Sequence, residues 1–218
     1  MSFKKSFEEM LGLEFGSPYN ALHKNKWENG YTFMGIYEGA HPNWSGWELI
    51  YRTLELYKDL RKTSYECYQN VFLTDLAKEF YKVNFWDKLR LDEIKSDRIA
   101  DLIFKFGVNV GIKRAVRYAQ MVANVRIDGI IGNNTISALN TLDSGCFEKR
   151  YKAEFMKFYE SLVKRNPDKN GKFSNGWSNR VRKAEVYLKT ELSIAVSYTH
   201  LTLPTTARRC RSRWSPYH

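Results

Sequence analysis

The sequence predicts a mainly α protein with about seven helices and one small β-hairpin. Apolar residues recur at helical spacing through most of the chain, most clearly from Ile99 to Val110. The stretch Tyr31–Tyr37, which follows the turn-forming pair Asn29-Gly30, carries the one convincing strand signal. A chain of 218 residues with 43% hydrophobic residues is also long enough to bury a core. We therefore expect a folded helical protein rather than a disordered one.

The first helix is predicted from apolar residues at helical spacing between Phe3 and Leu11, behind Ser2 as its cap. At about 100° per residue, Glu14 falls about 20° from Phe3 around the helix axis. Its carboxyl group is therefore expected at the edge of the apolar stripe. Gly16 is expected to end this helix.

Further helix starts are predicted where capping residues precede apolar periodicity. Ser45 with Glu48 forms a capping-box pattern, Thr74 is a candidate cap for the next helix, and Ser96 opens the clearest helix of the chain. Other helices are expected over residues 112–123, 147–162 and 177–188, with a tight glycine turn and a helix start at 128–136.

The formal net charge of +11 favours an anionic partner, because a basic surface concentrates polyanions around it. Peptidoglycan with its teichoic acids, nucleic acid and membrane surfaces all fit this requirement. Four arginines lie in residues 193–218, which contain no acid, so residues 1–192 carry +7. The aromatic content of 15% suits a cleft that stacks on sugar rings or bases, although most of these rings are expected in the core.

The last 26 residues change composition abruptly and lack sustained periodicity. Residues 196–206 resemble the translated read-through of a sequencing adapter. Residues 193–218 are therefore interpreted as a non-native tail and are left out of the functional reasoning.

Two isolated cysteines, Cys67 and Cys146, remain outside the tail, without CxxC spacing or a neighbouring histidine. This pattern predicts no metal site, and no cofactor is expected. The N-terminus lacks the apolar segment of a signal peptide, and no stretch approaches the ~20 apolar residues of a membrane span. We expect synthesis in the bacterial cytoplasm, without membrane insertion.

Glu14 is the candidate catalytic acid. Glycoside hydrolysis needs a carboxyl group that stays protonated near neutral pH so that it can protonate the leaving oxygen. An apolar face and a helix C-terminus both disfavour the ionised carboxylate and raise its pKa. By position alone, a partly exposed glutamate at a helix end is the favoured interpretation of Glu14.

The order of motifs around Glu14 resembles a known family. A helix, then Leu13–Gly16, an irregular stretch and Asn29–Ile36 look like the start of glycoside hydrolase family 108, which includes phage endolysins, prophage muramidases and secretion-associated muramidases. The resemblance implies a lysozyme-like fold with Glu14 as the catalytic glutamate. The positions that match the family pattern are Glu14, Gly16, Gly30, Thr32, Gly35 and Ile36.

The sequence departs from that pattern close to Glu14. Phe15 stands where the family has glycine, and Ser17 stands where it has tyrosine. A divergent active enzyme is the first interpretation, and a scaffold that has lost activity is the second.

The second catalytic group is not evident from the sequence. Inverting and retaining glycosidases ordinarily use a pair of carboxylates. Glu28 and Glu38 flank the hairpin, but neither matches a family position. Lysozyme-like enzymes with one glutamate and a water held by a hydroxyl group make Thr32 the second candidate catalytic residue, and the stereochemical outcome stays open.

The resemblance extends into the second half of the chain. Phe104–Gly111 is similar to the family's Phe-Asp-x-x-Val-Asn-x-Gly, with Lys105 in place of the aspartate. Ala119-Gln120, Asp128–Gly132, Thr135 and Gly176–Val181 resemble its helical peptidoglycan-binding domain, and Phe85-Trp86 resembles the Tyr-Trp that closes its catalytic half. The candidate substrate-binding residues are Gly16, Gly30, Phe33, Gly35, Tyr37, Trp86, Asn109, Gln120 and Asp128.

Two of these second-half features also have plain structural interpretations. Asp128, Gly129 and Gly132 suit a tight turn. The basic residues Lys113, Arg114, Arg117 and Arg126 form either a solvated face or a surface that holds a polymer.

These observations predict a lysozyme-like catalytic domain over residues 1–92 and a helical peptidoglycan-binding domain over 93–192. The expected activity is that of an N-acetylmuramidase, which hydrolyses the β-1,4 bond after N-acetylmuramic acid in peptidoglycan. We expect a monomer that acts in the periplasm or cell wall after a holin-dependent or other export route.

Two alternatives stay open. One is a non-catalytic wall-binding module on the same scaffold, motivated by the changed residues beside Glu14. The other is nucleic-acid binding, which rests on net charge and aromatic residues and requires a steep salt dependence of oligonucleotide binding; we expect no nucleic-acid partner.

Overall fold

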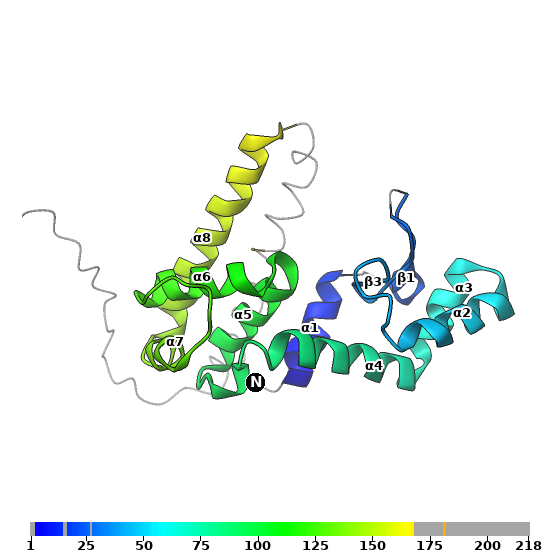
Figure 1. The fold of residues 1–218 in the computed structure, drawn as a ribbon, viewed down its shortest axis with the longest axis horizontal. Coiled ribbons are helices and arrows are strands. Elements are labelled where there is room, and N and C mark those ends of the chain that lie inside the picture. The colour runs from blue at the N-terminus through cyan, green and yellow to red at the C-terminus, as the bar shows by residue number, and fades with distance from the viewer. Residues whose placement is uncertain (1–2, 15–16, 27, 168–180, 182–218) are drawn as a thin grey trace, which may run out of the picture. The chain divides into compact units, whose positions relative to one another are not determined.

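The computed structural model describes residues 3–14, 17–26, 28–167 and 181, and for residues 12–14 it describes the backbone alone. The chain divides into two compact units, Met1–Asn140 and Thr141–His218. The described part of the chain is built from α-helices with one small sheet (Figure 1), which confirms the mainly α prediction. The predicted domain boundary near residue 92 stays a prediction.

The first unit begins with a helix and the sheet. Helix α1 (Phe3–Glu14) leads through a 3-10 turn, Pro18–Asn20, into three antiparallel strands in the order β1-β2-β3. The strands are β1 (Leu22–His23), β2 (Thr32–Phe33) and β3 (Ile36–Tyr37).

Eight further helical elements follow the sheet in the described part of the first unit. They are α2 (Gly46–Tyr57), α3 (Leu60–Gln69), α4 (Val71–Tyr81), a π-helical turn (Lys82–Trp86), a 3-10 turn (Leu91–Glu93), α5 (Asp97–Val110), α6 (Ile112–Ala123) and α7 (Asn133–Leu139).

The second unit contains α8 (Ser144–Arg165), which includes the predicted helix 147–162. The expected last helix, 177–188, lies outside the described residues apart from Val181. None of the described helices is both long enough and apolar enough to cross a membrane.

The sheet differs from the continuous strand predicted over Tyr31–Tyr37. The chain turns back at Met34-Gly35, so that Phe33 faces Ile36 and Thr32 faces Tyr37 across the hairpin. Gly35 has φ +85°, and Met34 also lies in the left-handed region at φ 48°. Glycine adopts such angles at little cost, which is why the turn forms here.

Two predicted caps are wrong. Ser45 is itself in the right-handed helical region and makes no side-chain cap, while Glu48 pairs with Arg52 instead. Helix α4 begins earlier than predicted, because the Asn70 side chain accepts a hydrogen bond from the Leu73 N–H at 3.0 Å. Thr74 lies inside the helix, where its hydroxyl donates to the Val71 carbonyl.

The other helix predictions around the middle of the chain are confirmed. Ser96 caps α5 by accepting from the Ile99 N–H, and α6 covers the predicted range 112–123. Apolar residues at helical spacing from Trp47 to Leu60 predict one continuous helix behind Ser45. Instead, Lys58, in the left-handed conformation, ends α2 before α3 begins. This break raises the number of α-helices in the described part of the chain to eight.

An aromatic cluster forms much of the core that joins α1 to the rest of its unit. The Phe3 ring lies edge-on to Trp86 at 5.4 Å and to Phe104 at 5.8 Å. Phe7 contacts Tyr81 at 5.6 Å between ring centroids. Burial of aromatic rings is a large source of stability, and here it fixes α1 against α4 and α5.

Candidate functional site

The position of Glu14 is set by helix α1, of which it is the last residue. The buried side chains of Phe3, Phe7 and Met10 confirm the predicted apolar face of this helix. The side chain of Glu14 and the whole of Gly16 lie outside what the structure describes. The catalytic assignment of Glu14 therefore stays a prediction. The helix that carries Glu14 is packed against the core through its apolar face.

Ions also hold α1 in place. The Lys105 ammonium on α5 lies 2.8 Å from the Glu9 carboxylate of α1 and 2.7 Å from Asp101 one turn earlier on α5. All three side chains are at least 85% buried. Lysine at 105, where the resemblance predicts aspartate, thus has two carboxylate partners.

Burial and charge act in opposite directions in this Glu9–Lys105–Asp101 triad. Burial by itself lowers the pKa of the Lys105 ammonium, but the carboxylates outweigh it and raise this pKa above the ordinary value. Burial raises the pKa of Asp101, against the opposing effect of Lys105. The lysine is therefore held in its charged form.

Thr32, the second candidate catalytic residue, lies on the central strand β2 and is 7% exposed. It pairs with His23 on one side and Tyr37 on the other. Phe33, its neighbour, is fully buried and stacks on Trp44 at 6.1 Å. Phe33 therefore packs in the core below the hairpin.

The hairpin turn is packed tightly against α4. A Cβ atom on Gly35 would lie 2.5 Å from the Tyr81 hydroxyl oxygen, which is too close for any side chain. That hydroxyl donates a hydrogen bond to the Met34 carbonyl at 2.8 Å. Glycine at 35 is therefore explained by this approach and by its positive φ.

Glu38 closes the other end of the hairpin. One of its oxygens accepts from the Tyr31 N–H at 2.9 Å and the other from the Tyr51 hydroxyl at 2.6 Å. The hydrogen bond to Glu38 is the main cause that raises the pKa of Tyr51 to about 12. A Cβ atom on Gly30, at φ +137°, would lie 2.8 Å from the same carboxylate. Glu38 thus holds the hairpin shut.

The other predicted residues of the first half are engaged in packing or local contacts. Glu28 accepts a hydrogen bond from Asn25 at 2.8 Å, and the Tyr37 ring covers Gly39. Trp86 is buried, and its indole N–H donates to Asp92 at 2.8 Å. Asn109 is half-buried near the end of α5. Substrate contact by these residues stays a prediction.

Gln120 organises the loop that follows α6. Its amide nitrogen lies 2.7 Å from Asp128 Oδ1, 3.0 Å from the Ile130 carbonyl oxygen and 3.2 Å from the Thr135 hydroxyl oxygen, and these three acceptors share its two N–H groups. Its amide oxygen accepts from the Gly129 N–H at 2.8 Å. The side chain is 1% exposed, so these bonds satisfy a buried amide. The sequence pattern that joined Gln120 to Asp128 therefore reflects one hydrogen-bonded unit.

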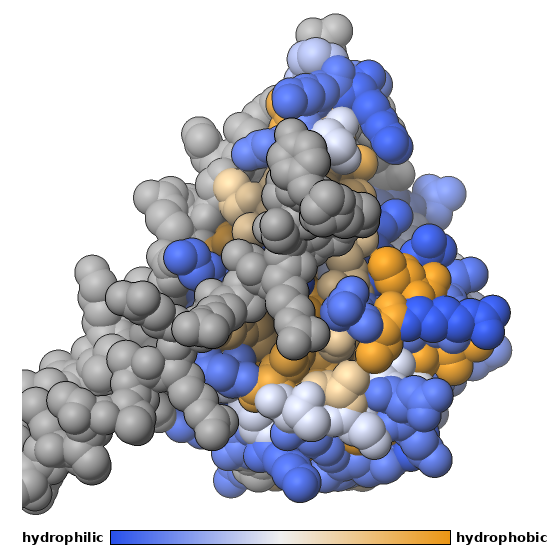
Figure 2. All heavy atoms as spheres, turned by 90° about the vertical axis from the view of Figure 1, so that its left-hand side faces the viewer, coloured by the Kyte–Doolittle hydropathy of each residue, from blue (hydrophilic) through white to orange (hydrophobic). Residues whose placement is uncertain are grey.

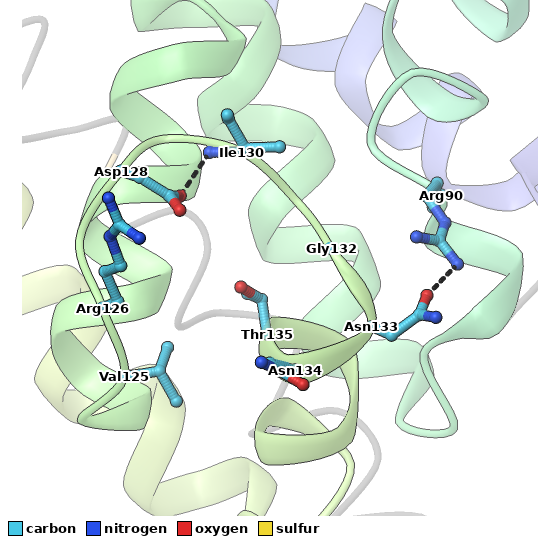
Figure 3. A pocket seen from close by; sticks show the side chains of 9 residues that line it. All are labelled: Arg90, Val125, Arg126, Asp128, Ile130, Gly132, Asn133, Asn134 and Thr135. Atoms are coloured by element: carbon cyan, nitrogen blue, oxygen red, sulfur yellow. Dashed lines mark hydrogen bonds between the residues drawn. The ribbon is translucent and has the colours of Figure 1, made fainter.

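A pocket of about 730 Å³ opens beside this loop (Figure 3). The sequence patterns identify Asp128, Gly132 and Thr135, and Arg126 as a basic residue, but not Arg90, Asn133 or Asn134. Arg90 comes from the segment before α5 and reaches the loop across more than 40 residues of sequence, so no local pattern identifies it. The pocket is lined by Arg90, Val125, Arg126, Asp128, Ile130, Gly132, Asn133, Asn134 and Thr135.

Three of the four basic residues predicted as a face line a second hollow of about 780 Å³ beside α6, whereas Arg126 lines the first pocket. Lys113, Arg114 and Arg117 lie there with Met121 and Ile127, and no acidic residue is among its lining. Met121 and Ile127 are about 40% exposed. The space-filling view likewise shows apolar patches between hydrophilic side chains (Figure 2).

The described residues contain no group of three His, Cys, Asp or Glu side chains that could hold a metal ion. Cys67 is a buried free thiol, and burial raises its pKa to about 11. A thiol that stays protonated is a poor nucleophile.

Comparison with family models finds two adjoining matches. Residues 21–111 match the model described as glycosyl hydrolase 108, and residues 110–182 match the model described as a predicted peptidoglycan domain. The two matches follow the order of the resemblance, but Leu13–Gly16 lies outside them. The first match begins after Glu14.

Comparison with solved structures finds the same fold elsewhere. The structure of Brucella abortus SagA is 21% identical, with a TM-score of 0.59 over 91% of this chain and 97% of that one. At this identity the likeness concerns the fold. No curated protein matches the sequence.

Proposed function

We propose, from the glycosyl hydrolase 108 region at 21–111 and the peptidoglycan domain that follows it, that this chain cleaves the β-1,4 bond after N-acetylmuramic acid in peptidoglycan. The two adjoining matches already support a glycoside hydrolase that acts on peptidoglycan. The order of these two domains is the observation that carries the proposal, because it pairs a glycosidase with a domain for its polymer. The proposed setting is phage-type lysis or opening of the wall for secretion.

Glu14 is the proposed acid. It ends a helix that buries Phe3, Phe7 and Met10 on one face, and a carboxyl group at a helix C-terminus is more easily kept protonated. Thr32, on the central strand of the sheet, is the proposed partner that holds the attacking water. A hydroxyl group can orient a water molecule, although it cannot act as a base of carboxylate strength.

The test is digestion of purified peptidoglycan, followed by mass analysis of the new ends. Reducing N-acetylmuramic acid ends are expected, whereas N-acetylglucosamine or anhydro ends would identify another bond or reaction. Glu14→Gln is expected to abolish release, since it removes the transferable proton. Glu8→Gln, the same change at an exposed site of the same helix, is the matched control and is expected to keep full activity.

Thr32 is tested by a pair of substitutions. Thr32→Val keeps the shape but removes the hydroxyl group, and a loss of about 10²-fold or more in kcat is expected if the hydroxyl positions water. Thr32→Ser restores the hydroxyl and should recover most of the rate. Equal activity of both variants would remove Thr32 from the mechanism.

A second function, non-catalytic wall binding, is favoured by one observation: the glycosyl hydrolase 108 match begins at residue 21, after Glu14. Cosedimentation with sacculi without release of muropeptides would support this function and overturn the catalytic one.

A further inference from the structure

The pocket beside the Gln120 loop lies where the two family matches adjoin. Arg90 belongs to the glycosyl hydrolase 108 region, and the other lining residues belong to the peptidoglycan domain. A ligand here therefore contacts both regions at once. In Figure 3, Arg126 and Asp128 lie on one side of the opening and Thr135 lies near its centre. The hydrogen-bonded pair Arg90–Asn133 lies on the opposite side.

The frame of this pocket is fixed before any ligand arrives. The Gln120 side chain on α6 holds the loop that follows this helix through four hydrogen-bond contacts. Arg90 is itself held by both oxygens of Glu93 at 2.6 Å and donates to Asn133 at 2.8 Å. A site that is already ordered loses little entropy on binding.

Two charged side chains of the lining are left for a ligand. Arg126 and Asp128 are both exposed, and the positive charge of Arg126 contributes to the lowered pKa of Asp128. Hydrogen bonds from Gln120 and from the Ile130 N–H lower the pKa of Asp128, so its carboxylate is ionised at neutral pH. Both of these bonds go to the Oδ1 atom. The pocket thus offers one cation and one anion.

The remaining lining argues against a sugar ring or a polyanion as the ligand. No aromatic side chain is among the lining residues, so a pyranose has no ring to stack on. The carboxylate of Asp128 would repel a phosphate-rich polymer. The hollow beside α6, which has three cations and no acidic residue in its lining, fits such a polymer better. Val125 and Ile130, the latter 69% exposed, provide apolar contact instead.

We propose that this pocket binds the peptide stem of peptidoglycan, with Arg126 on a stem carboxylate, Asp128 on the free ammonium group of the stem's diamino acid, and Ile130 against its aliphatic part. The stem combines these three features, and the pocket presents their complements. The inference rests on the proposed function for the choice of polymer. It assigns recognition of the peptide to the second region and leaves cleavage of the glycan to the first.

The test uses the full chain and a soluble stem tetrapeptide without sugar, which the enzyme cannot cleave. Binding is measured by calorimetry at low salt. Arg126→Gln is expected to weaken binding roughly tenfold or more, since a charge-assisted hydrogen bond is lost. Asp128→Asn keeps an Oδ1 acceptor for Gln120 and is expected to weaken binding of the same peptide by a similar factor.

Two modified peptides make the assignment specific. A peptide whose diamino-acid ammonium group is acetylated should bind the wild-type protein and Asp128→Asn with equal affinity. A peptide with amidated carboxylates should bind the wild-type protein and Arg126→Gln with equal affinity. Such double-mutant cycles isolate the pairwise contact from general effects of charge. Arg117→Gln removes one exposed cation that lines the other hollow, and is the matched control with unchanged peptide binding.

The outcomes are distinct from those of the cleavage test. Absence of peptide binding at millimolar concentration, or equal weakening by Arg117→Gln and Arg126→Gln, overturns the pocket proposal while cleavage of peptidoglycan can persist. Peptide binding without any cleavage leaves the pocket proposal standing and overturns the proposed hydrolysis. If both hold, Arg126→Gln should lower cleavage of peptide-bearing glycan but not of peptide-free glycan.

Discussion

Helix α1 and the loop after α6 are both fixed by one polar side chain, but the chemistry of the two anchors differs. Lys105 holds α1 through an ion triad with Glu9 and Asp101, whereas Gln120 holds its loop through a neutral amide. In the triad, one oxygen of Glu9 is buried without a hydrogen-bond partner among the described residues. The amide of Gln120 uses both of its polar atoms.

This difference determines how much stability is lost when each anchoring side chain is removed. Removal of one ion from a buried group leaves the others charged and unpaired, which is strongly destabilising. Removal of a neutral amide leaves partners that water can partly satisfy at the surface. The helix that carries Glu14 therefore depends on a charge balance, and the pocket loop does not.

The largest expected effect is that of Lys105→Met. Loss of the ammonium leaves Glu9 and Asp101 facing each other, and we expect a decrease of about 3–5 kcal/mol in the free energy of unfolding. Urea unfolding at neutral pH measures it. Lys157→Met, which removes the exposed ammonium paired with the half-buried Glu154, is the control and should cost under about 1 kcal/mol. Similar values for the two variants would contradict the buried triad.

A smaller effect is expected for Gln120→Leu, which removes the loop's four hydrogen bonds. We expect a loss of about 1–3 kcal/mol and faster hydrogen exchange at the Gly129 N–H, which donates to Gln120. Gln69→Leu, at an exposed position, is the matched control. Unchanged exchange at Gly129 would show that the loop has another anchor.

The smallest effect concerns the Tyr51–Glu38 bond at the hairpin, a third anchor that combines a neutral donor with a charged acceptor. The pKa of Tyr51 is raised to about 12 from an ordinary value of 10. Its contribution to stability is therefore complete below pH 10 and is lost as pH rises through 12. Tyr51→Phe should flatten the stability profile in that window. The same slope in both proteins would refute the bond.

The sequence predicted local features well where the signal was itself local. Helical spacing gave α1, α5 and α6, because one face of each is buried. Ser96 was identified as a cap because its hydroxyl bonds three residues ahead. Ser45 has the residue type of a cap but forms none, since its own backbone is already in the helical region.

The sites show a similar division. Gln120 and Asp128 lie eight residues apart, and the order of motifs in the sequence already assigns both to one region. Arg90 reaches Asn133 across 43 residues, and no periodicity or motif marks that contact. The second catalytic partner could not be assigned for the same reason: Glu38 flanks the hairpin in sequence, yet its oxygens bond to Tyr31 and Tyr51.

The sequence by itself determined the mainly helical class. It also indicated peptidoglycan as the polymer, through the resemblance to a family, and Glu14 at the end of the first helix as the candidate acid. These depend on residue type and short spacing. The tertiary structure decided that Lys105 faces Glu9 across 96 residues of chain, and that Arg90, Arg126 and Asp128 share one pocket. Such contacts follow from how helices pack, because side chains far apart in sequence meet only when the buried faces of their elements have been matched.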